Sequence, residues 1–282
     1  PVRYAWDQMS VYLNSSNLTK FGLGPLIRYQ LFKLRQWDQL SALRVNHFIA
    51  NSRFTAQRIK SYWARDADVL HPPVDVSRFS WDKPRDDIYL CLSRLVPNKR
   101  VDLVVKAFNK LKLPLYVVGD GPEKSYLKQI AGPNVKILGY MSGFDVEKLM
   151  STCRAFVYAG VEDFGIAPVE AMASGAPVIA FGKGGVLDTV RPLNKGVKDP
   201  TGILFPEQSL SSICHAISWF EDSQLWKDFS NESIRLWANS FSPKFFSRKF
   251  EKILRSQWNT HSKEFAFPSA SSTKILDINF ND

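Results

Sequence analysis

Two glutamates stand out in the most apolar stretch of the chain. Residues 159–181, AGVEDFGIAPVEAMASGAPVIAF, hold Glu162 and Glu170 eight positions apart among residues that otherwise suit a protein core. A buried carboxylate is costly unless a partner hydrogen-bonds to it or neutralises it. Carboxylates accept hydrogen bonds from neutral hydroxyls, so the pair predicts recognition of a sugar or a ribose.

Two cations occur elsewhere, between an expected strand and an expected helix. Arg94 and Lys99 lie on either side of Pro97, and cations beside a helix N-terminus favour a diphosphate. Taken alone, the pair is more often an ordinary basic surface turn. The carboxylates would repel a phosphate, so we expect the cations to lie away from them. Carboxylates that bind hydroxyls, together with cations that bind phosphates, predict a nucleotide-sugar site.

Two glycine-rich turns accompany these residues. GDGP, with Gly119, Asp120 and Gly121, forms a tight turn that lets a backbone approach a ligand closely. GKGG at 182–185 offers backbone amides for a phosphate, with Lys183 nearby. This second turn has neither the dinucleotide-binding spacing nor the Walker pattern.

Strands and helices alternate along most of the chain. We expect strands at 88–93, 115–119, 135–138, 155–159, 177–181 and 202–205, and helices at 101–111, 123–131, 145–153, 166–174 and 209–220. This alternation predicts an α/β fold, with a parallel sheet covered on both faces. Such sheets bind ligands beyond the carboxyl ends of their strands, where the residues above are expected to lie. Before this repeat we expect a helix at 24–44, a short strand at 45–52, a helix at 53–63 capped by Ser52, and an extended connector at 67–79.

Composition narrows the classes of protein. The chain has 282 residues, 45% of them hydrophobic, and a net charge of +10. This length suits one or two globular domains, and the charge favours an anionic partner. Nucleic-acid binding would depend on charge alone, because no nucleic-acid-binding module is recognisable. Cys91, Cys153 and Cys214 are expected to be buried free thiols, as in a reducing cytoplasm. No apolar run is long enough to span a bilayer.

Several motifs together resemble one enzyme family. EDFGIAPVE is similar to the E-x7-E signature of the retaining glycosyltransferases of family 4, which have the GT-B fold. SRLVPNKRVD, GDGP, LGY, EAMASGAPVIA and GG resemble further landmarks of that family in their usual order. NSRFTAQRI followed by HPPVD resembles its lobe-connecting segment. The resemblance covers roughly residues 45–250 and implies a complete C-terminal Rossmann-like lobe and a partial N-terminal lobe.

The resemblance also implies roles for individual residues. Arg94 and Lys99 would neutralise the donor diphosphate, and Glu162 would hold the donor sugar; these three form the expected catalytic set. Glu170 would hold the ribose hydroxyls. The other expected donor-binding residues are Phe164, Gly165 and Ile166, through their amides, and Gly119, Asp120 and Gly121. Members of the family mostly use no metal, and the leaving phosphate is thought to help deprotonate the acceptor, so we expect no metal and no cofactor.

The chain departs from the family pattern at several places. Its opening, PVRYAWD, resembles the middle of the family's N-terminal lobe, so we expect a fragment. We divide it into an N-terminal remnant with the connector (1–75), a nucleotide-sugar-binding lobe (76–242), a cross-back helix (243–258) and a disordered tail (259–282). Asp188 stands where many members carry Glu, which brings the geometry around the donor phosphate into question.

Three other residues or motifs invite chemical roles that we do not assign. DAD at 66–68 has the form of a metal-binding motif, but a solvated turn is the commoner explanation. His71 precedes two prolines in the connector, and His215 lies in an apolar helix. We expect both histidines to be structural.

The expected function is that of a retaining, metal-independent hexosyltransferase. The donor would be GDP- or UDP-linked, with GDP-mannose suggested by a resemblance of the opening to bacterial mannosyltransferases of surface polysaccharide synthesis. The acceptor would be a glycan or lipid-linked, and the basic helix at 24–44 is compatible with peripheral contact at the inner face of the membrane. The alternatives are another nucleotide-sugar enzyme, such as a 2-epimerase or a phosphorylase, and a non-catalytic binding module.

Overall fold

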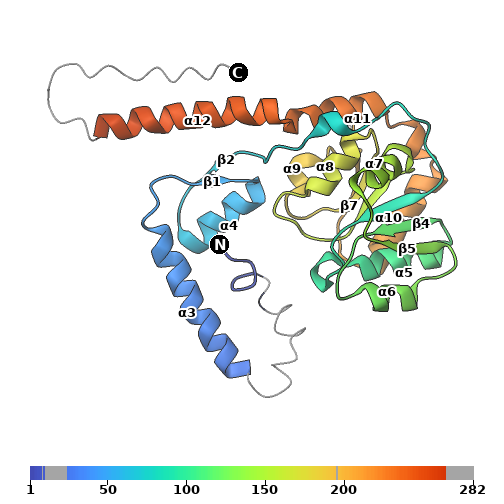
Figure 1. The fold of residues 1–282 in the computed structure, drawn as a ribbon, viewed down its shortest axis with the longest axis horizontal. Helices are drawn as coiled ribbons and strands as arrows, with labels where there is room; N and C mark the ends of the chain where they lie inside the picture. The colour runs from blue at the N-terminus through green and yellow to red at the C-terminus, as the bar shows by residue number, and fades with distance from the viewer. Residues whose placement is uncertain (8, 10–23, 195, 265–282) are drawn as a thin grey trace.

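The computed structural model describes residues 1–7, 9, 24–194 and 196–264 and shows two lobes of unequal size (Figure 1). Within the described residues, the first lobe contains a two-stranded parallel sheet and two helices. Its elements are α3 (Gly24–Ala42), β1 (Ile49–Ala50), α4 (Arg53–Trp63) and β2 (Asp68–Val69). The expected strand at 45–52 is therefore only two residues long. Ile27, Leu31 and Leu34, which recur at helical spacing on one face of α3, are half-buried.

The second lobe is built on six parallel strands in the order β5-β4-β3-β6-β7-β8. They are β3 (Tyr89–Leu92), β4 (Leu115–Val118), β5 (Val135–Gly139), β6 (Phe156–Tyr158), β7 (Val178–Phe181) and β8 (Gly202–Phe205). Counted from β3, this order is 3-2-1-4-5-6, which is that of the Rossmann fold. The expected parallel α/β sheet is confirmed.

Helices cover both faces of this sheet. One group, in which α5 packs against α6 and α10, comprises α5 (Val101–Leu111), α6 (Lys124–Ile130) and α10 (Leu210–Asp222). The other, in which α8 packs against α7, α9 and α11, comprises α7 (Gly143–Thr152), α8 (Ile166–Ala173), α9 (Val186–Thr189) and α11 (Asn231–Ala238). Strands covered on both sides consist of apolar residues throughout, and all four residues of β7 are buried.

Serine side chains define where several helices begin. The Ser52 hydroxyl accepts a hydrogen bond from the Thr55 amide at 3.0 Å, which confirms the expected cap of α4. Ser142, Ser209 and Ser230 cap α7, α10 and α11 in the same way. These caps satisfy amides that the helices themselves leave without partners.

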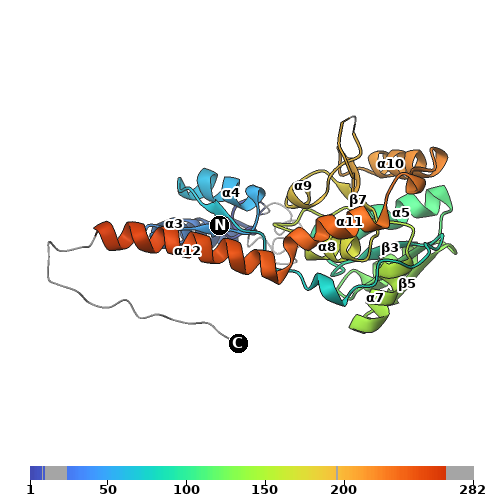
Figure 2. The same ribbon diagram turned by 90° about the horizontal axis from the view of Figure 1, so that it is seen from above.

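The C-terminal helix returns toward the first lobe. α12 (Pro243–Glu264) continues beyond its expected end at 258 and passes over the first lobe in two views (Figures 1 and 2). The part of the expected tail at 265–282 lies outside the described residues. The three cysteines are buried and free, as expected. His215, expected to be structural within an apolar helix, is instead exposed on the outer face of α10.

Candidate functional site

A cavity of about 680 Å³ lies at the carboxyl ends of β3, β4 and β6. β3 pairs with β4 on one side and with β6 on the other, so the strand order reverses here, which is where Rossmann-like sheets bind ligands. Asn51 and Pro72 contribute to the lining from the first lobe and the connector. From the second lobe the lining includes Ser93, Arg94, Lys99, Gly119, Asp120, Tyr158 and residues 162–168. The cavity therefore contains most of the expected site residues.

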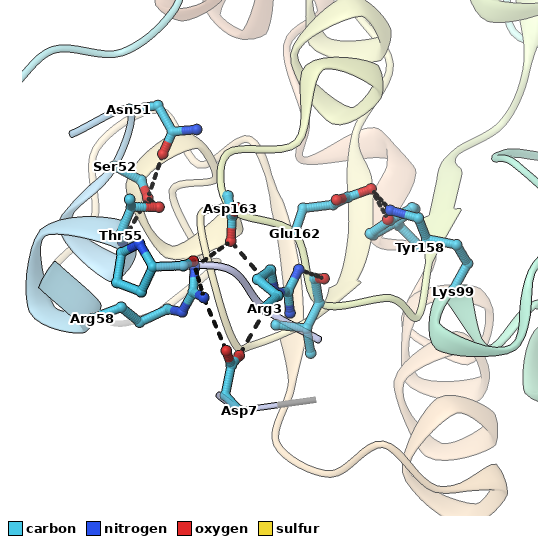
Figure 3. Close-up of polar contacts among 12 residues, drawn as sticks. Arg3, Asp7, Asn51, Ser52, Thr55, Arg58, Lys99, Tyr158, Glu162 and Asp163 are labelled. Carbon is cyan, nitrogen blue, oxygen red and sulfur yellow. Dashed lines mark hydrogen bonds and ion pairs between the residues drawn. The ribbon is translucent and has the colours of Figure 1, made fainter. Parts of the chain in front are cut away.

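Lys99 and Glu162 form an ion pair within this cavity. The Tyr158 hydroxyl donates a second hydrogen bond to the same carboxylate, at 2.6 Å (Figure 3). Burial, followed by the charge of Glu162, raises the pKa of Tyr158, which keeps its hydroxyl protonated as a donor. Our expectation that the cations lie away from the carboxylates is wrong for Lys99. Both charges are partly withdrawn from water, and pairing offsets that cost.

Arg94 is the second expected cation at the cavity. Its side chain is exposed at the cavity wall and makes no ion pair with any residue in the described part of the chain. Asp120, beside it in the lining, pairs with Lys124 at 2.8 Å and accepts a hydrogen bond from the Gly121 amide. Arg94 is thus available to an anionic ligand without breaking an existing contact.

Gly165 lets the chain turn into α8 at the cavity wall. Its φ of +90° lies in the left-handed region, which other residues rarely adopt. The first amides of α8, from Ile166 and Ala167, line the cavity and have no partner within the helix. The ring of Phe164 stacks on His71, with centroids 5.6 Å apart, so Phe164 is fixed by packing. The helix start therefore lies where amides were expected to meet a ligand.

The glycines of GDGP allow two neighbouring loops to approach each other closely. Gly119 lines the cavity with a φ of +136°, but a side chain there would collide with the Ser93 carbonyl. A side chain on Gly121, which is outside the lining, would collide with the Leu95 carbonyl. These glycines are required because the loop after β4 packs directly on the loop after β3.

The GKGG turn supports the Glu162 loop and does not cradle a phosphate. The Gly185 amide donates to the Glu162 carbonyl at 2.9 Å, so it is occupied. Side chains on Gly184 or Gly185 would collide with the backbone of residues 162–164. Lys183 is exposed and outside the cavity lining. The expected phosphate role of this turn is therefore wrong.

Glu170 lies one turn after Ile166 on α8, outside the cavity lining. Its carboxylate is half-buried and makes no hydrogen bond or ion pair with other described residues. Burial raises its pKa, an effect opposed by the charge of Arg78 and reinforced by that of Glu147. The ion pair between those two residues, at 2.9 Å, leaves Glu170 without a cation of its own. A partly desolvated carboxylate without a partner is typical of a ligand-binding position.

Asp188 joins the two lobes and lies outside the cavity lining. Its carboxylate accepts hydrogen bonds from the Arg53 amide at 2.7 Å and the Arg53 side chain at 2.8 Å, and contacts His71 at 3.1 Å. Burial alone would raise its pKa, but the hydrogen bonds from His71 and Arg53 lower it below the ordinary value. Our concern that Asp188 alters the donor-phosphate geometry is thus not supported, and His71 has the structural role we expected.

A second contact between the lobes was not apparent from the sequence. Arg3, Asp7, Arg58 and Asp163, which we call the interlobe cluster, form four ion pairs (Figure 3). Asp163 directly follows Glu162, and the other three residues belong to the first lobe. The cluster brings together residues up to 160 positions apart, and no local pattern marks such partners.

The DAD motif lies away from the cavity. Asp66 pairs with Lys60 at 2.8 Å, and Asp68 contacts His47 at 3.1 Å. In the ranges that the structure describes, no three His, Cys, Asp or Glu side chains gather as metal ligands would. Nor is any helix there both long and apolar enough to cross a bilayer.

Comparison of the sequence with family models identifies the family of this chain. Residues 74–236 match the family model of glycosyl transferases group 1. The chain belongs to this family. The matched residues contain all six strands of the second lobe, so this lobe is the Rossmann-like half of a GT-B fold.

Named relatives cover about half of the chain. A GDP-mannose-dependent monoacylated alpha-(1-6)-phosphatidylinositol monomannoside mannosyltransferase of Corynebacterium glutamicum is 32% identical over 50% of this chain and 45% of that enzyme. A GDP-mannose-dependent alpha-mannosyltransferase of Mycobacterium tuberculosis is 33% identical over 50% of this chain and 38% of that enzyme. The similarity thus spans less than half of each relative.

A solved structure shares the fold. HepE of Anabaena, in complex with UDP-glucose, superposes with a TM-score of 0.65 at 20% identity, covering 79% of this chain and 67% of that one. The superposition covers a larger part of this chain than the family model does. The arrangement of strands and helices described above is therefore one that a solved structure also has.

Proposed function

We propose that this chain is the donor-binding part of a retaining hexosyltransferase that uses GDP-mannose. The observation that carries the proposal is the convergence of Arg94, Lys99, Glu162 and the start of α8 on one cavity at the strand-order reversal. Membership of the glycosyl transferases group 1 and the GDP-mannose dependence of both named relatives support this donor. The acceptor would be a glycan or a lipid-linked sugar.

The donor diphosphate would bind between Arg94, Lys99 and the first amides of α8. Lys99 then exchanges Glu162 for a phosphate oxygen, and the released carboxylate accepts a hydrogen bond from a hydroxyl of the sugar. As the bond between the anomeric carbon and the phosphate oxygen breaks, positive charge grows on the sugar and negative charge on the phosphate. Glu162 stabilises the first, and the two cations stabilise the second.

The acceptor hydroxyl would attack the anomeric carbon on the face that the phosphate leaves, so the configuration is retained. Its proton passes to the departing phosphate oxygen, and the products are the glycosylated acceptor and the nucleoside diphosphate. In this scheme no protein nucleophile is needed, and the two cations supply the charge that a metal would otherwise provide. Glu170 would accept hydrogen bonds from the two ribose hydroxyls.

A nucleotide-sugar assay tests the function directly. The chain is incubated with GDP-mannose, UDP-glucose and UDP-N-acetylglucosamine, and release of the nucleoside diphosphate is followed with and without EDTA. We expect release from GDP-mannose, with EDTA having no effect. Conversion of the intact nucleotide-sugar to its 2-epimer would favour an epimerase. Binding without any release, by the longest expressed form of the protein, would favour a binding module.

Contact with a membrane surface is a further part of the proposal. α3 exposes large apolar side chains close to basic ones. The apolar residues of α3 are Leu26, Tyr29, Phe32, Trp37 and Leu40, and its basic ones are Arg28 and Lys33; exposed Leu43 and Arg44 follow directly after the helix. This mixture suits an anionic lipid surface and would place the protein at the cytoplasmic face of the membrane. Co-sedimentation with phosphatidylglycerol vesicles should fall on Phe32→Ser and Trp37→Ser substitution.

A further inference from the structure

The short loop that carries Glu162 is held from the first lobe on both sides of that residue. The carbonyl of Val161 accepts a hydrogen bond from Arg3 Nη1 at 2.9 Å. The carboxylate of Asp163 pairs with Arg58 Nη1 at 3.3 Å and with Arg3 Nε at 3.6 Å. Glu162 itself points the other way, toward Lys99 and Tyr158 (Figure 3).

The backbone geometry makes these contacts act on Glu162. Glu162 pairs with Gly184 as an isolated parallel bridge, and the side chains of Glu162 and Asp163 point to opposite sides of this loop (Figure 3). The Asp163 carboxylate meets Arg58 and Arg3 of the first lobe, while the Glu162 carboxylate meets Lys99. A rotation of the loop about its own axis that releases Asp163 would also turn Glu162 away from the donor sugar.

The two arginines of the interlobe cluster are largely withdrawn from water. The Arg58 side chain is 7% exposed and that of Arg3 is 15% exposed. Asp7 supplies the second carboxylate, 2.9 Å from Arg58 and 3.6 Å from Arg3. Two buried cations thus share two carboxylates. Loss of the Asp163 charge would leave Asp7 as the one carboxylate of the cluster for both cations, and a buried charge that loses its partner forces rearrangement.

A second anchor fixes the helix that carries Arg58. α4 is held at its N-terminus by Asp188 and, further along, by Asp163 through Arg58. Asp188 lies three residues after Gly185, whose amide is bonded to the Glu162 carbonyl. Two attachment points on one helix set its orientation relative to the second lobe. The Glu162 loop is therefore positioned by both lobes together.

We propose that Asp163, together with Arg58 and Arg3, is a positioning residue that sets the Glu162 carboxylate for the sugar-transfer step. This inference rests on the proposed role of Glu162 in holding the donor sugar. It assigns to the first lobe a function in donor chemistry, because the first lobe holds the loop from which Glu162 acts. Arg94 and Lys99 come from the other side of the cavity, so binding of the diphosphate does not depend on the cluster.

The test uses Asp163→Asn, which keeps the shape of the side chain and removes its charge, and Arg58→Gln. Asp66→Asn is the matched control, because it removes an ion pair of similar length on the first lobe, away from the cavity. Hydrogen exchange of the amides at 159–166 should become several-fold faster in the two cluster variants and stay unchanged in the control. GDP-mannose hydrolysis should slow about tenfold to a hundredfold, since small misplacements of a catalytic group are this costly.

Affinity separates positioning from a merely structural role. We expect calorimetry to show no loss of GDP affinity in either cluster variant, and the double variant to lose no more activity than the less active single variant. Unchanged exchange at 159–166 in Asp163→Asn would overturn the proposal, whether or not the protein turns over GDP-mannose. A parallel loss of GDP affinity would also overturn it. Absence of turnover in the unaltered protein would instead contradict the proposed function, with the exchange result still deciding on the cluster.

Discussion

At the residue scale, the pairing of Lys99 with Glu162 has a measurable consequence. The residue types and their spacing predict both for the site, and both line the same cavity. They could not show the ion pair, because Glu162 is 63 positions from Lys99 in the chain and contacts it only through the fold. The pairing means that a diphosphate must compete with Glu162 for Lys99.

We therefore expect Glu162→Gln to bind the free nucleoside diphosphate roughly two- to fivefold more tightly, the strength of a partly exposed ion pair. Turnover should fall at least about a hundredfold, because the charge that stabilises the developing cation is lost. Calorimetry and GDP release measure the two effects. Tyr158→Phe is the control, since it keeps the ion pair and should leave affinity for the diphosphate unchanged. Weaker binding in Glu162→Gln would contradict this account of the pair.

Glu170 should show the opposite behaviour. Glu170→Gln should weaken nucleoside diphosphate binding about tenfold, the cost of losing a hydrogen bond to a charged group. Its melting temperature should be equal or higher at pH 7. Burial raises the pKa of Glu170 above the ordinary 4.5, so its ionised form destabilises the fold above the raised pKa and has no such effect below about pH 4.5. Any gain in stability should therefore vanish in acid. A fold that melts earlier at pH 7, with affinity unchanged, would make Glu170 structural.

At the scale of elements, the strands and helices of the second lobe could be predicted because their signals are local. Apolar runs, turn residues and serine caps indicate where each element begins and ends, and α5 was expected at its observed bounds. The loops were harder to interpret. Gly119 and Gly185 mark close approaches in the sequence, but only the fold shows that the approaching group is a neighbouring loop.

This interpretation of the glycines predicts the effect of a single methyl group. Gly185→Ala should lower the free energy of unfolding by about 1–3 kcal/mol or more, because the added carbon collides with the Phe164 backbone. It should also slow turnover through the displaced Glu162 loop. Gly24→Ala is the control, since nothing lies within 4 Å of the added carbon. Chemical denaturation measures the free energy of unfolding of both variants. A stable Gly185→Ala variant that loses only phosphate affinity would restore the phosphate-cradle interpretation.

At the scale of the whole molecule, the contacts between the lobes were beyond prediction from sequence. Arg53, Arg58 and the residues they contact, Asp188 and Asp163, lie more than 100 positions apart, and a charged residue on an expected helix is usually exposed. An extended connector and a structural role for His71 were predicted from the sequence. The partners that hold the first lobe in place became visible only in three dimensions.

The contact that Asp188 makes between the lobes depends on pH. Its pKa is lowered from 3.8 in the fold, so its contribution to stability is present above about pH 4 and is lost as the pH falls through the lower folded value. Asp188→Asn should lower the melting temperature at pH 7, and the difference from the unaltered protein should narrow below pH 4. Thermal melts from pH 3 to 7 measure this. A difference that persists unchanged at pH 3 would show that the charge of Asp188 does not hold the lobes.

The central claim is that Arg94 and Lys99 bind the diphosphate of a nucleotide-sugar. Calorimetric titration of GDP into the unaltered chain and into Arg94→Ala/Lys99→Ala tests it most directly. Lys252→Ala/Arg255→Ala, which removes two exposed cations from α12, is the matched control. Each lost contact to a charged group should cost about 1.5–3 kcal/mol, so the double variant should lose at least about a hundredfold in affinity while the control loses none. Equal affinity in the double variant and the unaltered chain would show that the diphosphate binds elsewhere.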